Sequence, residues 1–413
     1  MADSSRGKKL FLIDAMSLIF RAFFAPMQTA LVSPGGLPTK AVYIFVRTLR
    51  KLLKDHRPDF VAVAFDLAAP TFRDQLFAEY KANRPAFPED LGVQLPYVRR
   101  FCKALGLPLS EREGFEADDV IGTLAKVGAA QGQDVFIVSG DEDLFQLVSD
   151  RVRVVKPSRS ASDGETLCDV EKVKEILGVE PSQVVDWLAL TGDPSDNIPG
   201  ARPLPGQEPV LAEGEKKRSY IGPKGATEII RQFGTLEKAL ENFGMVSKAS
   251  YRDALRDFRN EALLSKELAK IRTDVPLDVT LEQLAPGPPD LAEIRALCQE
   301  LGFASLLREF LEEAPAPAEA AVDSEDLNTK EALEKWLAPL TQEARAPLAI
   351  ALAVEGEEGF AGRLTGLGLS DGKRLASVDL AGSRELLASL KPFLMDAARP
   401  KAVHNSKLLH LLL

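Results

Sequence analysis

The sequence predicts an α/β protein in which a parallel β-sheet is flanked by helices, followed by a helical layer and then a second, smaller α/β domain. Up to about residue 160, short apolar runs rich in β-forming residues alternate with stretches of helical periodicity, which is typical of a parallel sheet covered by helices. From about residue 170 to 290 the strand-like runs stop and short helices replace them. Strand-like runs return only after a Pro/Ala-rich, acidic stretch at 312–327.

Each element follows from its own residue pattern. The apolar runs that predict strands in the first region are KLFLID (9–14), FVAVAFD (60–66), DVFIVSGDED (134–143) and RVRVV (151–155). Apolar residues at helical spacing predict helices at 39–55, 95–106 and 116–132, and then at 170–178, 181–192, 225–234, 235–243 and 260–274. The second domain contains predicted strands at 348–356, 363–370 and 374–380, with a helix at 383–396.

These elements divide the chain into four regions. We expect an α/β core at 1–170, a helical region at 171–290 with an insertion at about 202–219, a connecting helix and linker at 291–328, and the second domain at 329–413. The apolar stretch NSKLLHLLL at 405–413 leads us to expect that the chain stops inside a domain.

Composition narrows the class of protein. Hydrophobic residues make up 45% of the chain and charged residues 27%, as in ordinary globular proteins. The N-terminus lacks the apolar run of a signal peptide or membrane span, so we expect a cytoplasmic protein with no membrane partner. Three cysteines without a CxxC pair and three scattered histidines exclude a disulfide framework and a zinc centre.

The net charge of −10 argues against general binding to polyanions, although basic residues cluster locally. The clusters lie in VRTLRKLLKDHR (46–57), FRDQLFAEYKANRP (72–85) and EKKRSYIGPKGATEIIRQF (215–233). Each could be the solvated face of a helix or a contact for an anionic partner.

Nine acidic residues recur where predicted strands end or helices begin. They are Asp14 and Asp66 at the ends of the first two strands, Asp141 and Asp143 after the third, Glu116, Asp118 and Asp119 at a helix start, and Asp193 and Asp196 in the turn TGDPSDN. Taken singly, each could be a helix cap or a turn residue. Because ligands of doubly wound sheets bind beyond the carboxyl ends of the strands, we expect the nine carboxylates to meet at one edge.

Such a group of like charges repels strongly unless cations neutralise it. Oxygen ligands without histidine or cysteine favour Mg²⁺ or Mn²⁺, and the number of carboxylates indicates two ions. Two-metal sites activate a water molecule and stabilise the leaving oxygen of a phosphodiester. The acidic set therefore predicts a nuclease. We expect Asp119→Ala or Asp141→Ala to abolish cleavage while leaving the fold intact.

Seven ordered segments between residue 8 and about residue 280 give the sequence a specific resemblance. They are LIDAMSLIFRAFFA, VAFD, FRDQLFAEYKANRP, GFEADDVIGTLA, GDEDLFQL, LTGDPSDNIPG and SKELAKIRTDVPL. Together they resemble the 5′-nuclease domain of bacterial DNA polymerase I, in the flap endonuclease superfamily. The resemblance implies a PIN-like sheet, a helix–three-turn–helix layer, the nine acids as metal ligands, and removal of 5′ flaps and RNA primers during replication and repair.

The segment FRDQLFAEYKANRP resembles the family's arch, through which a single-stranded 5′ end passes. Arg73, Tyr80, Lys81 and Arg84 fall on its matching positions. The resemblance implies that Lys81 and Arg84 neutralise the scissile phosphate and that Tyr80 stacks on an unpaired base. Arg73 is expected to contact DNA. A mobile basic surface helix is the alternative explanation for this segment.

The helical layer resembles a helix–three-turn–helix that grips the duplex backbone, with K⁺ as a further candidate ion. Gly200, Gly222 and Lys224 match the family's DNA-contacting positions. Tyr220 stands where the family has a glycine, and Gly225 where it usually has a threonine, so this loop departs from the family pattern at two positions. The inserted EKKR (215–218) could compensate.

Residues 329–413 resemble the start of the ribonuclease H-like 3′–5′ exonuclease domain of the same polymerase. Ala353 replaces the first aspartate of its DxE pair and Leu409 a further aspartate, leaving only Glu355, so we expect this domain to be inactive. The expected partners are DNA with a 5′ flap or nick, an RNA primer–DNA hybrid, and a polymerase domain in a longer or separate chain.

The expected protein is a monomer associated with the nucleoid. A catalytically weak DNA-binding module that positions a polymerase is the alternative to a nuclease. An RNA-processing nuclease of the PIN-like group is a third interpretation.

Overall fold

The computed structural model describes residues 7–27, 30–157, 164–204, 220–313, 324–342, 348–355, 363–372, 374–380, 384–396 and 400–403. These residues form two compact units that divide between Glu312 and Glu313. Most of the 202–219 insertion, the centre of the linker and Leu409 lie outside the described residues. None of the helices in these ranges has both the length and the apolar composition needed to span a membrane.

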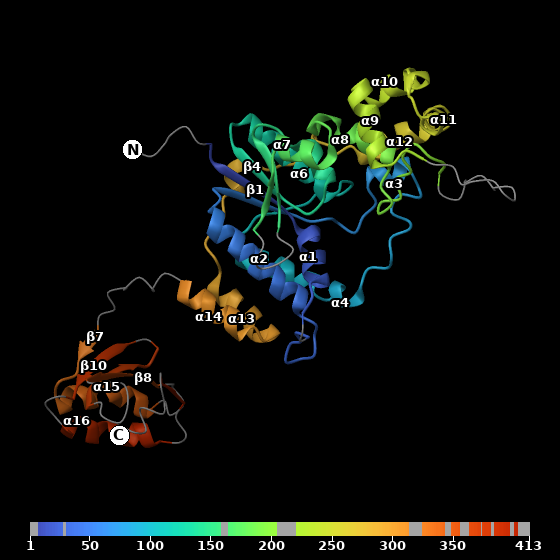
Figure 1. Ribbon diagram of the computed structural model, residues 1–413. Helices are drawn as coiled ribbons and strands as arrows, with labels where there is room; N and C mark the ends of the chain where they lie inside the picture. Colours follow the sequence, from blue (N-terminus) through green and yellow to red (C-terminus); the bar gives the residue numbers. More distant parts are fainter. Residues whose placement is uncertain are drawn as a thin grey trace. The chain divides into compact units, whose positions relative to one another are not determined.

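The first unit is built on a six-stranded sheet with strand order β3-β2-β1-β4-β5-β6 (Figure 1). The strands are β1 (Lys9–Asp14), β2 (Phe60–Ala64), β3 (Leu109–Ser110), β4 (Asp134–Val138), β5 (Val152–Lys156) and β6 (Thr166–Cys168). All neighbours pair in parallel except β5 and β6, which are antiparallel. The predicted α/β class and the four predicted strands are confirmed, whereas the two- and three-residue strands β3 and β6 were not predicted.

Both faces of this sheet are buried because its strands are apolar on both sides. In β1, Leu10 and Leu12 face one core while Phe11 and Ile13 face another. Helices α1 (Ala15–Phe24), α2 (Lys40–His56) and α5 (Leu95–Ala104) cover the second face, and α6 (Ala117–Ala130) covers the first. The sequence did not predict α1, which starts directly after β1 where the Asp14 carboxylate accepts the Ser17 N–H.

Short helices connect these elements. They are α3 (Phe72–Leu76), α4 (Glu89–Gly92) and η1 (Asp143–Leu147) in the α/β core, with η2 (Pro181–Gln183), η3 (Phe243–Met245) and η4 (Leu281–Leu284) farther along the chain. The helical layer consists of α7 (Val170–Leu177), α8 (Val184–Thr191), α9 (Pro223–Phe233), α10 (Leu236–Glu241), α11 (Ala249–Asp257) and α12 (Arg259–Ala269). Of these six helices, α11 was not predicted.

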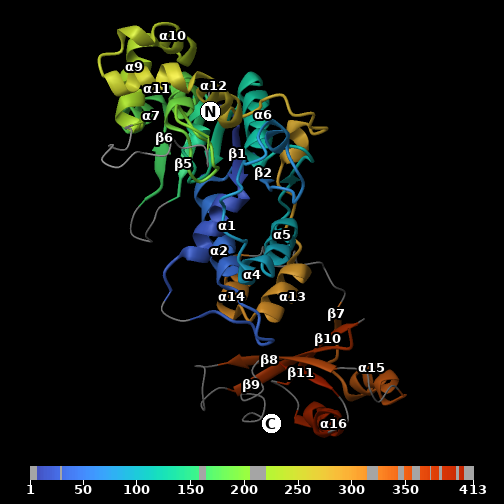
Figure 2. The same cartoon turned by 90° about the vertical axis from the view of Figure 1, so that its right-hand side faces the viewer.

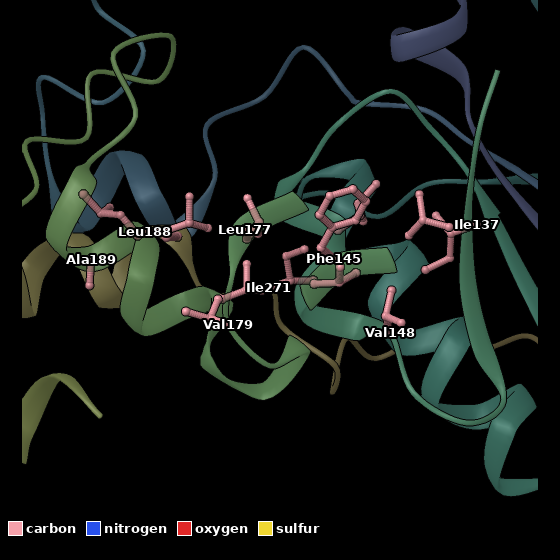
Figure 3. Close-up of a cluster of buried hydrophobic side chains, with 14 of the residues drawn as sticks. Ile137, Phe145, Val148, Leu177, Val179, Leu188, Ala189 and Ile271 are labelled. Carbon is pink, nitrogen blue, oxygen red and sulfur yellow. The ribbon is translucent and has the colours of Figure 1, made fainter. Parts of the chain in front are cut away.

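The helical layer shares one hydrophobic core with the sheet. Ile137 of β4 and Phe145 of η1 belong to the same buried cluster as Leu188 of α8 (Figure 3). Ile271, which follows α12, packs in this cluster too. The layer therefore belongs to the same compact unit as the sheet, whereas the sequence had indicated a separate helical layer.

Helices α13 (Leu291–Leu301) and α14 (Ala304–Glu313) complete the first unit, where the sequence predicted only a connecting helix. They lie beside α2 in both views (Figures 1 and 2). Leu297 and Phe310 are buried in the core beneath α2 and α5. Arg50 of α2 forms a 2.8 Å ion pair with Glu309 of α14. Residues 291–312 are thus part of the first unit itself.

The second unit is a mixed five-stranded sheet with two helices. Its elements are β7 (Ser324–Asp326), α15 (Lys330–Gln342), β8 (Leu348–Glu355), β9 (Arg363–Ser370), β10 (Leu375–Asp379), α16 (Arg384–Met395) and β11 (Lys401–Val403), in sheet order β11-β8-β9-β10-β7. β8, β9 and β10 form an antiparallel meander, and β11 is parallel to β8. The predicted strands and helix are present, and the ribonuclease H-like relationship stays a prediction.

Candidate active-site cleft

A cleft of about 1340 Å³ opens in the first unit, at the carboxyl ends of β1, β2 and β4. The predicted carboxylates that line it are Asp14, Asp66, Glu116, Asp118, Asp141, Asp143 and Asp196. Tyr80, Lys81 and Arg84 from the predicted arch segment line it as well. The structure thus brings together seven of the nine predicted ligands, and leaves Asp119 and Asp193 out of the cleft wall.

Asp14 is the most enclosed acid that lines the cleft, with 7% of its surface exposed. Its carboxylate accepts hydrogen bonds from the Ser17 N–H at 3.0 Å and the Ser139 hydroxyl at 2.7 Å. Burial, with help from the charges of Asp66 and Asp141, raises the pKa of Asp14 to about 6 in spite of these bonds. Ser139 also accepts the N–H of Asp141 at 3.1 Å, so this hydroxyl joins two candidate ligands.

Asp66 connects the end of β2 to the start of α6, because its carboxylate accepts the Ala117 N–H at 2.8 Å. That bond brings Asp118, one residue farther along, to the same edge as the strand ends. Burial raises the pKa of Asp118 well above its usual value, and the charges of Asp14, Asp141, Asp66 and Glu116 raise it further. Acids from the ends of β1, β2 and β4 and from the start of α6 therefore repel one another across the cleft.

A second group of acids lies beside the first. Burial raises the pKa of Asp143, with added repulsion from Asp141, Asp193 and Asp196. Asp193 is close enough to contribute this charge, although both of its oxygens accept the Ser195 hydroxyl. Burial also acts to raise the pKa of Asp196, but the charges of Lys81 and Arg84 outweigh it and hold that pKa below the usual value.

The donor set fits hard divalent cations, because it consists of carboxylate oxygens whose mutual repulsion a cation would relieve. The described histidine, cysteine and acidic side chains include no three that are already gathered around one point suited to an ion. The acids share one cleft without forming a finished metal site. Metal binding at these residues therefore remains a proposal.

The raised pKa of Asp14 predicts a pH dependence in the metal-free protein. A folded-state pKa of about 6 against an ordinary 3.8 means that stability is fully present below pH 3.8 and is lost as the pH rises through about 6. The shift corresponds to roughly 3 kcal/mol. We expect denaturant unfolding in a chelator to show a smaller difference between about pH 5 and pH 7.5 for Asp14→Asn than for the wild type. An identical pH dependence in both proteins would contradict the buried-acid interpretation.

The structure does not support Asp119 as a metal ligand. Asp119 is fully buried, and its two oxygens accept bonds from the Arg73 guanidinium at 2.7 and 3.0 Å. They also accept the backbone N–H groups of Arg272 at 2.8 Å and Glu116 at 3.1 Å. Donors of the protein itself therefore occupy the hydrogen-bonding positions around the Asp119 carboxylate. The helix-cap alternative considered for this segment explains Asp119, since Glu116 and Asp119 form a reciprocal capping box at the start of α6.

The same ion pair engages Arg73, for which the resemblance implied a DNA contact. Arg73 is 2% exposed and donates its remaining N–H groups to the carbonyl oxygens of Leu268 and Lys270. Burial opposes its charge, but the bond to Asp119 raises the pKa of Arg73. Arg73 thus joins α3 to α6 and to the end of α12, and its guanidinium lies at the cleft wall already paired with Asp119.

Tyr80 is likewise not placed to stack on a base. Only 6% of its surface is exposed, and its hydroxyl donates to Glu116 at 3.2 Å and Asp196 at 3.0 Å. Burial raises the pKa of Tyr80, and both carboxylates raise it further, so the phenol stays protonated. Tyr80 therefore lies in the cleft wall with its hydroxyl bonded to two of the acids.

Lys81 and Arg84 do lie in the cleft, as the resemblance implied. The Lys81 Nζ donates to Glu116 at 2.6 Å and lies 3.7 Å from Asp196. Arg84 pairs with Asp196 through one terminal nitrogen. Two cations are thereby held among the acids, within reach of an anion that enters the cleft.

In the helical layer, the three residues matched to DNA contacts differ in their surroundings. Gly200 is buried, donates its N–H to the Ser265 hydroxyl at 2.8 Å, and has a φ of 74° with no room for a Cβ atom. Its backbone conformation and the lack of space explain the glycine without a contact to DNA. Gly222 and Lys224 lie at the exposed start of α9, and an added Cβ at Gly222 would meet open space.

The two departures from the family pattern have local explanations. Tyr220 is not among the described residues with positive φ, and its ring packs edge-on against Phe258 at 5.9 Å. A Cβ added to Gly225 would come within 2.5 Å of the Tyr251 ring, so a threonine does not fit here. The position is a glycine because Tyr251 fills the space.

Comparison with known proteins places the chain in a family. The model of the 5′–3′ exonuclease N-terminal resolvase-like domain matches residues 9–178, and that of its C-terminal SAM fold matches residues 219–292. A 5′–3′ exonuclease from Aquifex aeolicus is 37% identical over 304 residues, which cover 73% of this chain and 95% of that protein. The chain belongs to the 5′–3′ exonuclease family. Membership confirms the family resemblance and the nuclease class that the sequence predicted.

This 5′–3′ exonuclease family member is also similar to longer proteins. DNA polymerase I of Bacillus subtilis is 40% identical over 323 residues, which cover 78% of this chain and 34% of the polymerase. The chain thus spans about a third of the length of the DNA polymerase I relatives that it matches. The bacteriophage T5 D15 flap endonuclease, solved with DNA and metal ions, superposes with a TM-score of 0.50 at 22% identity, covering 74% of this chain and 98% of that one. This likeness shows the fold alone.

Proposed function

We propose that this chain is a divalent-metal-dependent, structure-specific nuclease that hydrolyses phosphodiester bonds at 5′ flaps and nicks and removes RNA primers. The observation that supports it best is the acidic cleft, where seven carboxylates from β1, β2, α6, η1 and their connecting turns lie beside two cations. Membership of the 5′–3′ exonuclease family favours the same reaction.

Two Mg²⁺ or Mn²⁺ ions fit this set of oxygen ligands. The residues that would hold them are Asp14, Asp66, Glu116, Asp118, Asp141 and Asp143, with Asp193 and Asp196 at the margin. When bound, such ions supply an activated water and stabilise the leaving oxygen. Ser17 and Ser139 hold the Asp14 carboxylate in a fixed orientation for this task.

The cations of the cleft act on the substrate. Lys81 and Arg84 exchange their carboxylate partners for the scissile phosphate and offset the charge that develops on it. Tyr80 keeps Glu116 and Asp196 in place by donating to both.

The helical layer holds the duplex part of the substrate. Lys224 and the free N–H groups at the start of α9 contact the phosphate backbone without reading sequence, and K⁺ is a candidate ion there. The proposed partners are flapped or nicked DNA, an RNA primer–DNA hybrid and a polymerase domain, with the protein acting as a monomer at the nucleoid. The T5 D15 structure, which contains DNA and metal ions, is consistent with these proposals.

Incubation of the full chain with a 5′-labelled flap duplex, with and without Mg²⁺, tests the proposal. We expect release of the flap only with the metal. Binding without cleavage at any Mg²⁺ concentration would instead favour a DNA-binding module. Preferential cleavage of structured RNA would favour an RNA-processing nuclease.

We also propose that the second unit lacks 3′–5′ exonuclease activity. Ala353 lies within β8, where it pairs with Gly366 and offers no ligand oxygen in its side chain. Neither 3′-end degradation nor flap cleavage is expected to change in Glu355→Ala.

A further inference from the structure

Two asparagines of the family-like segments have no part in the proposed chemistry, yet the structure pairs them. Asn83 belongs to FRDQLFAEYKANRP and Asn197 to LTGDPSDNIPG. The Asn83 side-chain amide donates to the Pro194 carbonyl oxygen at 2.7 Å. In return, the Asn197 amide donates to the Glu79 carbonyl oxygen at 2.6 Å.

A backbone hydrogen bond lies between these two side-chain bonds. The Lys81 N–H donates to the Asp196 carbonyl oxygen at 3.0 Å. These three hydrogen bonds join the segments 79–84 and 193–197, which lie more than 100 residues apart in the chain, in addition to the bonds that Tyr80 and Arg84 donate to residues 195–196. We refer to these three bonds as the asparagine stitch.

The stitch holds a backbone conformation that lysine rarely adopts. Lys81 has a φ of 58° and Asn197 a φ of 60°, both in the left-handed region. Asparagine tolerates this region, whereas lysine needs its surroundings to hold it there. In this conformation the Lys81 side chain reaches Glu116 and the next turn directs Arg84 to Asp196.

We propose that Asn83 and Asn197 are positioning residues that dock the arch segment on the turn after α8, so that Lys81 and Arg84 enter the cleft together. The inference rests on the proposed nuclease function. Both amide bonds are exposed to solvent, so they contribute little to global stability. Their effect is on the positions of the Lys81 and Arg84 side chains relative to the carboxylates of the cleft.

Kinetics on a 5′-flap substrate test this role. Asn83→Ala removes one bond, and Asn197→Gly removes the other while keeping a residue that accepts positive φ. We expect kcat to fall roughly 10- to 100-fold because the cations are misplaced by about an ångström. KM should stay within about twofold and Tm within about 2 °C.

The background variant Lys81→Ala separates positioning from other effects. If the asparagines act through Lys81, adding Asn83→Ala to Lys81→Ala should cost far less activity than it does in the wild type. Equal losses in both backgrounds would overturn the proposal, as would a large fall in Tm. Asn242→Ala is the matched control, because the Asn242 amide makes a similar 2.9 Å bond to the Lys238 carbonyl at the end of α10. Its kinetics should be unchanged.

Limited trypsin digestion gives a readout that does not need nuclease activity. Release of the stitch should speed cleavage after Lys81 in both asparagine variants and leave it unchanged in Asn242→Ala. An unaltered rate of cleavage after Lys81 would overturn the docking role. If the wild-type chain cleaves no nucleic acid, the proposed function fails, and the trypsin result still decides whether the stitch holds the segment.

Discussion

Asp141→Ala is expected to reduce cleavage of a 5′-flap duplex by at least about 1,000-fold, because loss of a proposed metal ligand would remove several kcal/mol of transition-state stabilisation. Asp141 lines the cleft, and its enclosure there raises the pKa of its carboxyl. Removing one of several repelling charges should leave the metal-free protein at least as stable as the wild type. Single-turnover cleavage and thermal unfolding in a chelator measure the two effects.

Glu142→Ala provides the control for Asp141→Ala. Glu142 is the next residue, but its carboxylate pairs with Lys156 at 2.8 Å and does not line the cleft. Its replacement should leave cleavage within about twofold of the wild type. Retention of wild-type activity by Asp141→Ala at saturating Mg²⁺ would remove Asp141 from the proposed ligands.

The second large effect is on stability, and it reverses an expectation drawn from the sequence. Asp119→Ala should destabilise the protein by about 3–5 kcal/mol, since it leaves the buried Arg73 guanidinium without its partner. Fully buried Asp119 also caps α6 and accepts the Arg272 N–H, and both bonds are lost. Equilibrium urea unfolding in a chelator measures this change without any contribution from metal binding.

The surface pair Arg272–Asp274 offers a matched control. Its distance is 2.8 Å, similar to the buried pair, but Asp274 is 61% exposed. Asp274→Ala should therefore change stability by less than about 1 kcal/mol. Combining Arg73→Met with Asp119→Leu should recover part of the loss, because no unpaired charge stays buried. An Asp119→Ala protein that is as stable as the wild type yet inactive would restore Asp119 to the metal ligands.

Local patterns predicted the elements wherever a pattern was long enough to be distinctive. The run KLFLID predicted β1 because every second residue faces one of two cores, and both cores are apolar. The two residues of β3, Leu109 and Ser110, have no such run. Their pairing with β2 depends on the position of the sheet and not on their own sequence.

The positions of the acids likewise depend partly on local sequence and partly on residues far away in the chain. Asp14, Asp66 and Asp141 were predicted to meet because parallel strands end at one edge of a sheet. Whether a given carboxylate faces the cleft or the interior depends on which side chains approach it. The Asp119 carboxylate faces the interior because Arg73, 46 residues earlier in the chain, donates hydrogen bonds to it.

By itself the sequence determined the α/β class, the edge of the sheet at which the carboxylates gather, and the nuclease family. Only the tertiary structure showed that the side chains of Asp119, Arg73 and Tyr80 are bonded to partners within the protein, and that Asn83 and Asn197 join the arch segment to the turn after α8. The physical reason is how far apart in the chain the interacting residues are. Strand and helix preferences arise from neighbouring residues, whereas the partner of a polar side chain is chosen by atoms that folding brings from distant parts of the chain.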